Sequence, residues 1–79
     1  MSIEVRLFPT LQNLSLSKRE KFEVVWHEGL TAMEILQDEG FDEKDADAIL
    51  PVINDQQGRL TTPLQDGDSL ELRINLQGG

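Results

Sequence analysis

The chain has 79 residues and a net charge of −8, from 15 acidic and 7 basic side chains. This length suits one domain but not two, and the acidic balance argues against nucleic acid binding, which requires a basic surface. The sequence contains no cysteine, which excludes disulfides, thiolate metal ligands and a thiol nucleophile. The negative charge favours a basic protein partner, or simply keeps a small protein in solution.

No segment is typical of export or of membrane insertion. Residues 1–6 place a charge at every second position from Glu4 onward, unlike a signal peptide. No apolar run approaches the roughly 20 residues that a membrane span needs. The absence of cysteine fits a reducing compartment, so we expect a cytoplasmic protein.

The first part of the chain predicts two strands. Apolar and polar residues alternate over residues 3–8 and again over 22–27, as in half-buried strands. Between them, residues 10–14 predict one helical turn with Leu11 and Leu14 on the same side. Two strands joined by a loop suggest a hairpin.

The main helix is predicted to begin after Thr31. Thr31 is a good N-cap, and Glu34 completes a capping box three residues later. Leu30 can pack on Ile35 as a hydrophobic staple, and Gly40 is placed to end the helix in a left-handed conformation. The apolar face of this helix contains Ala32, Met33, Ile35 and Leu36.

Short elements follow the helix. Residues 42–48 predict one more helical turn, and residues 50–54 predict a short strand. Pro51 confines that strand to an edge of the sheet or to its first residues. Residues 55–58 predict a turn.

The last strand is predicted over residues 69–76, where Leu70, Leu72, Ile74 and Leu76 alternate with polar residues. An Asp66-Gly67-Asp68 turn precedes it. Two carboxylates around a glycine are too few ligands for calcium, whereas Asp bonds its own backbone and Gly accepts a positive φ. We therefore interpret this segment as a turn and predict no metal site.

The order of elements predicts an α+β fold. One main helix packs on one face of a mixed sheet with four to five strands. If the last strand lies beside the first, both ends of the sequence meet in the centre of the sheet. We expect a domain over residues 1–75 and a flexible tail over residues 76–79, because glycine lacks a Cβ and termini fray unless they are tied down.

Five segments together resemble the MoaD/ThiS family of ubiquitin-like sulfur carriers, and the opening is closer to the small subunit of molybdopterin synthase. These segments are Val5-Arg6-Leu7-Phe8-Pro9-Thr10-Leu11, Gly29-Leu30-Thr31, Val52-Ile53-Asn54, Pro63-Leu64-Gln65-Asp66-Gly67-Asp68 and Gly78-Gly79. The resemblance covers essentially the whole chain. It implies a β-grasp (ubiquitin-like) roll.

The resemblance also implies a chemistry for Gly79. In such carriers an ATP-dependent E1-like activating enzyme adenylates the terminal carboxylate, which becomes a thiocarboxylate and donates sulfur in molybdopterin, tungstopterin or thiamine biosynthesis. Leu76, Gln77, Gly78 and Gly79 would then form the tail that enters a partner, a molybdopterin synthase large subunit or a thiazole synthase. The chain would be a carrier or non-catalytic subunit, not an enzyme. It would bind no cofactor itself, because the partner uses the ATP.

Three residues are candidates for the partner interface. Phe8 falls on the face opposite Ile3, Val5 and Leu7, so it either anchors a partner or packs under the loop that follows. Leu60 is either a second interface residue or part of the core. Arg73 shares an exposed face with Glu71 and meets either an acidic group on a partner or a neighbouring strand.

Other functions remain open at this point. Gly79 could instead form an isopeptide bond as a ubiquitin-like protein modifier, or the chain could be a non-covalent β-grasp binding module. A stand-alone enzyme is disfavoured, because no acid, base and nucleophile come together in the sequence. The only histidine, His27, is interpreted as structural, on a strand beside Trp26. Neither the sulfur acceptor, nor the partner, nor the oligomeric state follows from the sequence.

Overall fold

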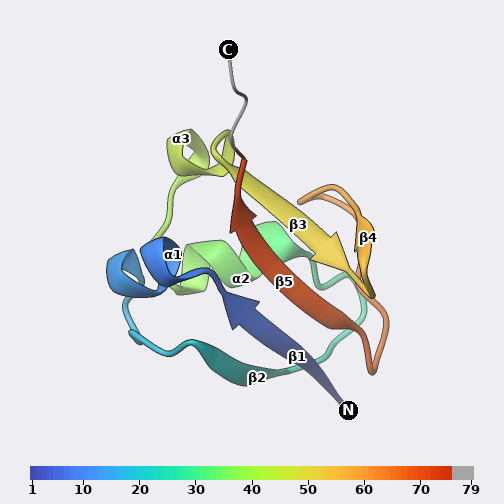
Figure 1. Ribbon diagram of the computed structural model, residues 1–79. Helices are drawn as coiled ribbons and strands as arrows, with labels where there is room; N and C mark the ends of the chain where they lie inside the picture. Colours follow the sequence, from blue (N-terminus) through green and yellow to red (C-terminus); the bar gives the residue numbers. More distant parts are fainter. Residues whose placement is uncertain (76–79) are drawn as a thin grey trace.

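The computed structural model describes residues 1–75 (Figure 1). The predicted tail, Leu76, Gln77, Gly78 and Gly79, lies outside the described residues. The elements, in chain order, are β1 (Ser2–Leu7), α1 (Pro9–Leu14), β2 (Lys21–Val25), α2 (Ala32–Asp38), α3 (Glu43–Ala46), β3 (Ile49–Ile53), β4 (Gln56–Gln57) and β5 (Ser69–Ile74).

The five strands form one mixed sheet in the order β2-β1-β5-β3-β4. β1 and β5 lie side by side and run in the same direction (Figure 1), with Val5 opposite Leu70 and Leu7 opposite Leu72. β2 pairs antiparallel with β1, and β3 pairs antiparallel with β5. The predicted α+β architecture is confirmed. The first and last described strands meet in the centre of the sheet, as expected.

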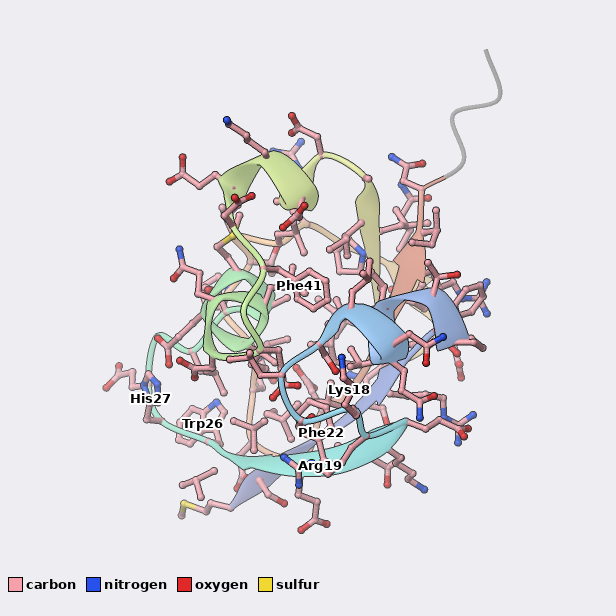
Figure 2. All side chains as sticks on the ribbon, turned by 90° about the vertical axis from the view of Figure 1, so that its left-hand side faces the viewer. Lys18, Arg19, Phe22, Trp26, His27 and Phe41 are labelled. Atoms are coloured by element: carbon pink, nitrogen blue, oxygen red, sulfur yellow. The ribbon has the colours of Figure 1, made fainter. Side chains whose placement is uncertain are left out.

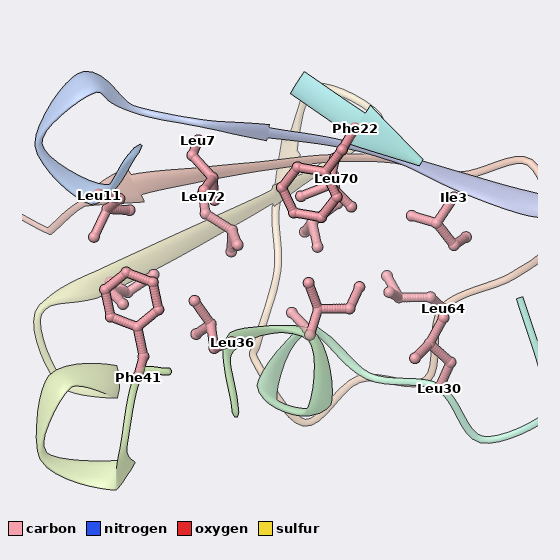
Figure 3. Packing of buried hydrophobic residues seen from close by; sticks show 14 residues of the cluster. Ile3, Leu7, Leu11, Phe22, Leu30, Leu36, Phe41, Leu64, Leu70 and Leu72 are labelled. Atoms are coloured by element: carbon pink, nitrogen blue, oxygen red, sulfur yellow. The ribbon is translucent and has the colours of Figure 1, made fainter. Parts of the chain in front are cut away.

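The core lies between the sheet and α2 (Figure 3). Every second residue of β1 and β5 points into it, because successive side chains of a strand alternate between the two faces. α2 adds Ala32, Ile35 and Leu36, and Leu30 is buried beside them. Phe41 then returns to the same core after Gly40, whose φ of 91° ends the helix as predicted.

The predicted capping box at the start of α2 is only half correct. Thr31 Oγ1 accepts the backbone N–H of Glu34 at 3.3 Å, so Thr31 is the N-cap. The Glu34 carboxylate, however, pairs with His27 Nε2 at 2.7 Å instead of the Thr31 backbone. A reciprocal box does form at α3, where Asp42 and Asp45 bond each other's backbone N–H groups.

The predicted helical turn over residues 10–14 is confirmed, but its two leucines differ in burial. Leu11 is 2% exposed and contacts the core, but Leu14 is 67% exposed. The two lie three residues apart in a helix of only six residues. Such a short helix can bury one side chain against a small core and leave its i+3 neighbour at the rim.

The region after α3 also differs from the prediction. The turn lies at Asn54 and Asp55, whose φ values are 52° and 67°, and Gln56–Gln57 is strand β4 rather than part of the turn. The expectation that Pro51 confines this strand to an edge or to its first residues was wrong, because β3 lies between β5 and β4 and Pro51 is its third residue. The carbonyl of Pro51 accepts Gly58 N–H at 3.0 Å. The nitrogen of Pro51 carries no hydrogen, so Pro51 cannot donate a second hydrogen bond to the same neighbour. This missing bond explains why β4 is short.

Two segments that carried the family resemblance are bonded to each other. Asn54 Oδ1 accepts Ser69 N–H at 2.9 Å, and Asn54 Nδ2 donates to Asp68 Oδ1 at 2.8 Å. Asp68 Oδ2 also accepts Gln65 N–H at 2.8 Å, and Gly67 has a φ of 88°. The predicted Asp-Gly-Asp turn is confirmed. It fixes the point where β5 begins.

Over residues 1–75, no helix has both the length and the apolar character needed to cross a membrane.

Candidate functional site

The face of the sheet opposite α2 carries the exposed residues of the two central strands. Ile3, Val5 and Leu7 of β1 point to the core, which leaves Glu4 and Arg6 on the other face. The edge strand β2 adds Lys21, whose Nζ lies 3.4 Å from Glu4 Oε2. This face therefore alternates positive and negative side chains.

Phe8 and Arg73 lie together at one end of this face. The Arg73 Cζ atom is 5.4 Å from the centroid of the Phe8 ring, a cation–π geometry. The parallel register causes this contact, because Leu7 is opposite Leu72 and Phe8 N–H donates to Leu72 O at 3.0 Å. Phe8 is 37% exposed, so it does not pack fully under the loop that follows.

Arg73 is held from a second side as well. Its Nε donates to Glu71 Oε1 at 2.7 Å, and both residues project from the same face of β5. This bond matches neither predicted alternative, because Glu71 lies on the same strand as Arg73; the contact beyond β5 is the one with Phe8, which follows β1. The side chain remains 47% exposed, so it can also contact a partner.

Leu60 belongs to a different surface. It is partly buried against the core, and its carbonyl accepts Met33 N–H at 3.0 Å. It lines a shallow hollow together with Met33, Leu50 and Asn75, the last described residue. Neither Phe8 nor Arg73 lines this hollow, so the three predicted interface residues are not one cluster.

His27 lies outside the strand on which it was predicted, because β2 ends at Val25. Its ring is half exposed beside α2 (Figure 2), and its Nε2 atom lies 2.7 Å from Glu34 Oε2. The hydrogen bond to Glu34, followed by the bond to the Glu28 carbonyl, raises the pKa of His27 above its usual 6.5. Trp26, next to it, donates its indole N–H to Leu64 O at 2.8 Å.

Within residues 1–75, no cluster of three or more His, Asp or Glu side chains could hold a metal ion. His27 Nε2 and Glu34 Oε2 lie 2.7 Å apart, and Thr31 Oγ1 accepts the backbone N–H of Glu34 as the N-cap of α2. Gly79, on which the predicted chemistry depends, lies outside the described residues.

No protein-family model and no curated relative matches the chain. Solved structures do match over the whole chain. SAMP1 from Haloferax volcanii is 20% identical, with complete coverage of both chains and a TM-score of 0.72. A putative molybdopterin converting factor subunit 1 from Pyrococcus furiosus is 17% identical over 94% of this chain and 97% of its own, with a TM-score of 0.69.

A third match is subunit 1 in the complex of subunits 1 and 2 of molybdopterin-converting factor from Helicobacter pylori. It is 29% identical, with complete coverage of both chains and a TM-score of 0.62. The chain has a β-grasp fold. The predicted resemblance to subunit 1 of molybdopterin-converting factor (MoaD) is confirmed. The similar proteins are small carriers or subunits, and the H. pylori structure contains one with its partner subunit.

Proposed function

We propose that this chain is a ubiquitin-like sulfur carrier of the MoaD/ThiS type, with the Gly79 carboxylate as the carrying group. The observation that supports it most is the path of β5. This strand runs through the centre of the sheet and ends at Ile74, and three residues separate Ile74 from Gly78-Gly79. The match to the H. pylori subunit 1 along the full length adds to it.

The proposed chemistry takes place at a carboxylate, which is a poor electrophile. A Gly79 carboxylate oxygen attacks the α-phosphorus of ATP and releases pyrophosphate, which leaves an acyl-adenylate. A hydrosulfide equivalent then attacks the carbonyl carbon and displaces AMP, which gives the thiocarboxylate. An activating enzyme supplies the ATP site, so this chain needs to contribute only its tail and its docking surface.

The docking surface proposed for that role is the exposed end of the central strands, with Phe8 and Arg73. Leu60, in its separate hollow beside Asn75, is a second candidate contact. Leu76, Gln77, Gly78 and Gly79 would enter the active site of the activating enzyme, and later that of a sulfur-accepting partner such as a molybdopterin synthase large subunit or a thiazole synthase. We place this reaction in the cytoplasm.

The absence of cysteine gives a direct test. A thiol alkylating reagent has no cysteine to modify in this chain, so alkylation after incubation with an activating enzyme, ATP and sulfide reports a thiocarboxylate. Intact mass should show one added label, absent when Gly79 is deleted and present in a Val25→Ala control. If no pyrophosphate is released and no labelled chain is formed, the proposal is refuted. Recovery of the chain only as isopeptide conjugates would favour the protein modifier.

A further inference from the structure

Arg73, on the exposed face of the sheet, is held by two neighbouring side chains. Its guanidinium is bonded through Nε to Glu71 Oε1 at 2.7 Å and stacks near the ring of Phe8, 5.4 Å from the centroid. The Glu71 side chain is only 27% exposed, so this partner is itself restricted. A long side chain that is already ordered loses less conformational entropy when it binds.

The Arg73 side chain is 47% exposed and has donors that Glu71 does not use. A guanidinium has five N–H donors, and Glu71 uses the one on Nε. Within residues 1–75, no acceptor bonds the Nη1 or Nη2 groups of Arg73. These two groups form a fork that fits the two oxygens of a carboxylate.

The distribution of charge decides which face can approach an acidic group. Residues 28–47, which contain α2 and α3, hold eight acidic side chains and one basic one, Lys44. The rest of the chain holds seven acidic and six basic side chains. The helical side therefore repels an anionic group. The sheet face is close to neutral, because Arg6, Lys21 and Arg73 balance Glu4, Glu23 and Glu71 there.

We propose that the activating enzyme places an Asp or Glu carboxylate on the Nη edge of Arg73, beside an apolar contact for the ring of Phe8. This inference rests on the proposed function and specifies its docking chemistry. A protein carboxylate fits better than a polyanion, because the net charge of −8 repels a phosphate polymer. Glu71 acts as a positioning residue, since it orients Arg73 and contacts no partner itself.

The test uses the activating enzyme of the same organism, isolated as the fraction in which ATP–pyrophosphate exchange depends on the added purified chain. The KM for the chain is then measured with Arg73→Gln and with Arg6→Gln. Arg6 is the matched control, because it lies on the same face and its replacement removes the same charge. Trp26 fluorescence shows that each variant is folded.

We expect Arg73→Gln to raise the KM at least roughly tenfold with little change in kcat, as for loss of a charged bidentate contact. Arg6→Gln should change the KM less than about threefold, and Arg73→Lys should fall between, because it keeps the charge without the fork. Arg73→Glu should be rescued by one Lys replacement among the surface carboxylates of the enzyme.

Two failures are distinguishable. Absence of any chain-dependent exchange would refute the proposed function. Normal exchange, with equal KM values for Arg73→Gln and Arg6→Gln, would overturn only the carboxylate contact, and so would a set of enzyme Lys variants none of which rescues Arg73→Glu.

Discussion

Truncation of Leu11 and of Leu14 should have very different effects on stability, although the two leucines lie three residues apart in α1. Leu11 is 2% exposed and Leu14 is 67% exposed. Replacing a buried leucine with alanine costs about 2–5 kcal/mol, and α1 is peripheral and able to relax, so we expect about 2–3 kcal/mol for Leu11→Ala. Leu14→Ala should change the free energy of unfolding by less than about 0.5 kcal/mol.

Urea denaturation measures this difference. A domain of this size has a free energy of unfolding of roughly 4–12 kcal/mol and an m-value near 1 kcal/mol/M, so Leu11→Ala should lower the midpoint by about 2–3 M. Trp26 is the only tryptophan, and its indole is bonded to Leu64 O, so its fluorescence reports the native state. Equal midpoints for Leu11→Ala and Leu14→Ala would refute the placement of α1.

Three further predictions concern α2 and the turns. Thr31→Ala should destabilise the protein by about 1 kcal/mol, because it removes the N-cap bond, and thermal unfolding measures this loss. Glu34→Gln should lower the pKa of His27, followed by NMR of its ring protons. Since the pKa of His27 is raised in the folded state, its stabilisation is complete below about pH 6.5 and is lost as pH rises through the folded pKa. Glu34→Gln should therefore cost more at pH 5.5 than at pH 8, and the opposite order would contradict the assigned pair. Gly40→Ala and Gly67→Ala should each lose about 1 kcal/mol in urea denaturation, because both positions have a positive φ. A much larger loss at Gly40 would show that the cost comes from crowding against Leu16, whose Cγ lies 2.9 Å from a Cβ built at Gly40.

The sequence predicted most of the fold, because its signals were local and repeated. The strands β1 and β5 could be predicted from the alternation of apolar and polar residues within each strand. The N-cap at Thr31 likewise depends only on residues close to it in sequence. The exposure of Leu14 was not predicted because packing decides it, and the turn expected at Gln56–Gln57 was wrong because the turn lies at Asn54 and Asp55. Asn54 shows why: its positive φ shifts the turn toward the N-terminus, and its side chain is needed to hold Ser69.

The candidate site was predictable residue by residue but not as an arrangement. Exposure of Phe8 and Arg73 follows from strand alternation, but their contact follows from the parallel register of β1 and β5, which joins residues about 65 positions apart in sequence. Leu60 shows the converse, because nothing in its neighbourhood indicated that it would line a hollow with Met33. The pair of His27 with Glu34 could not be predicted from the capping box, because that motif assigns the Glu34 carboxylate to the backbone of Thr31.

The parallel pairing of β1 with β5 also governs how the protein responds to force. Tension applied at the start of β1 and at the end of β5 acts along the two strands in opposite directions. Their hydrogen bonds, which run between the strands, are then sheared together instead of opening one after another. Forced unfolding is limited by the rate of that single rupture. A machine that extracts the chain by its C-terminal end, with the N-terminal strand held, therefore meets its greatest resistance at the first step.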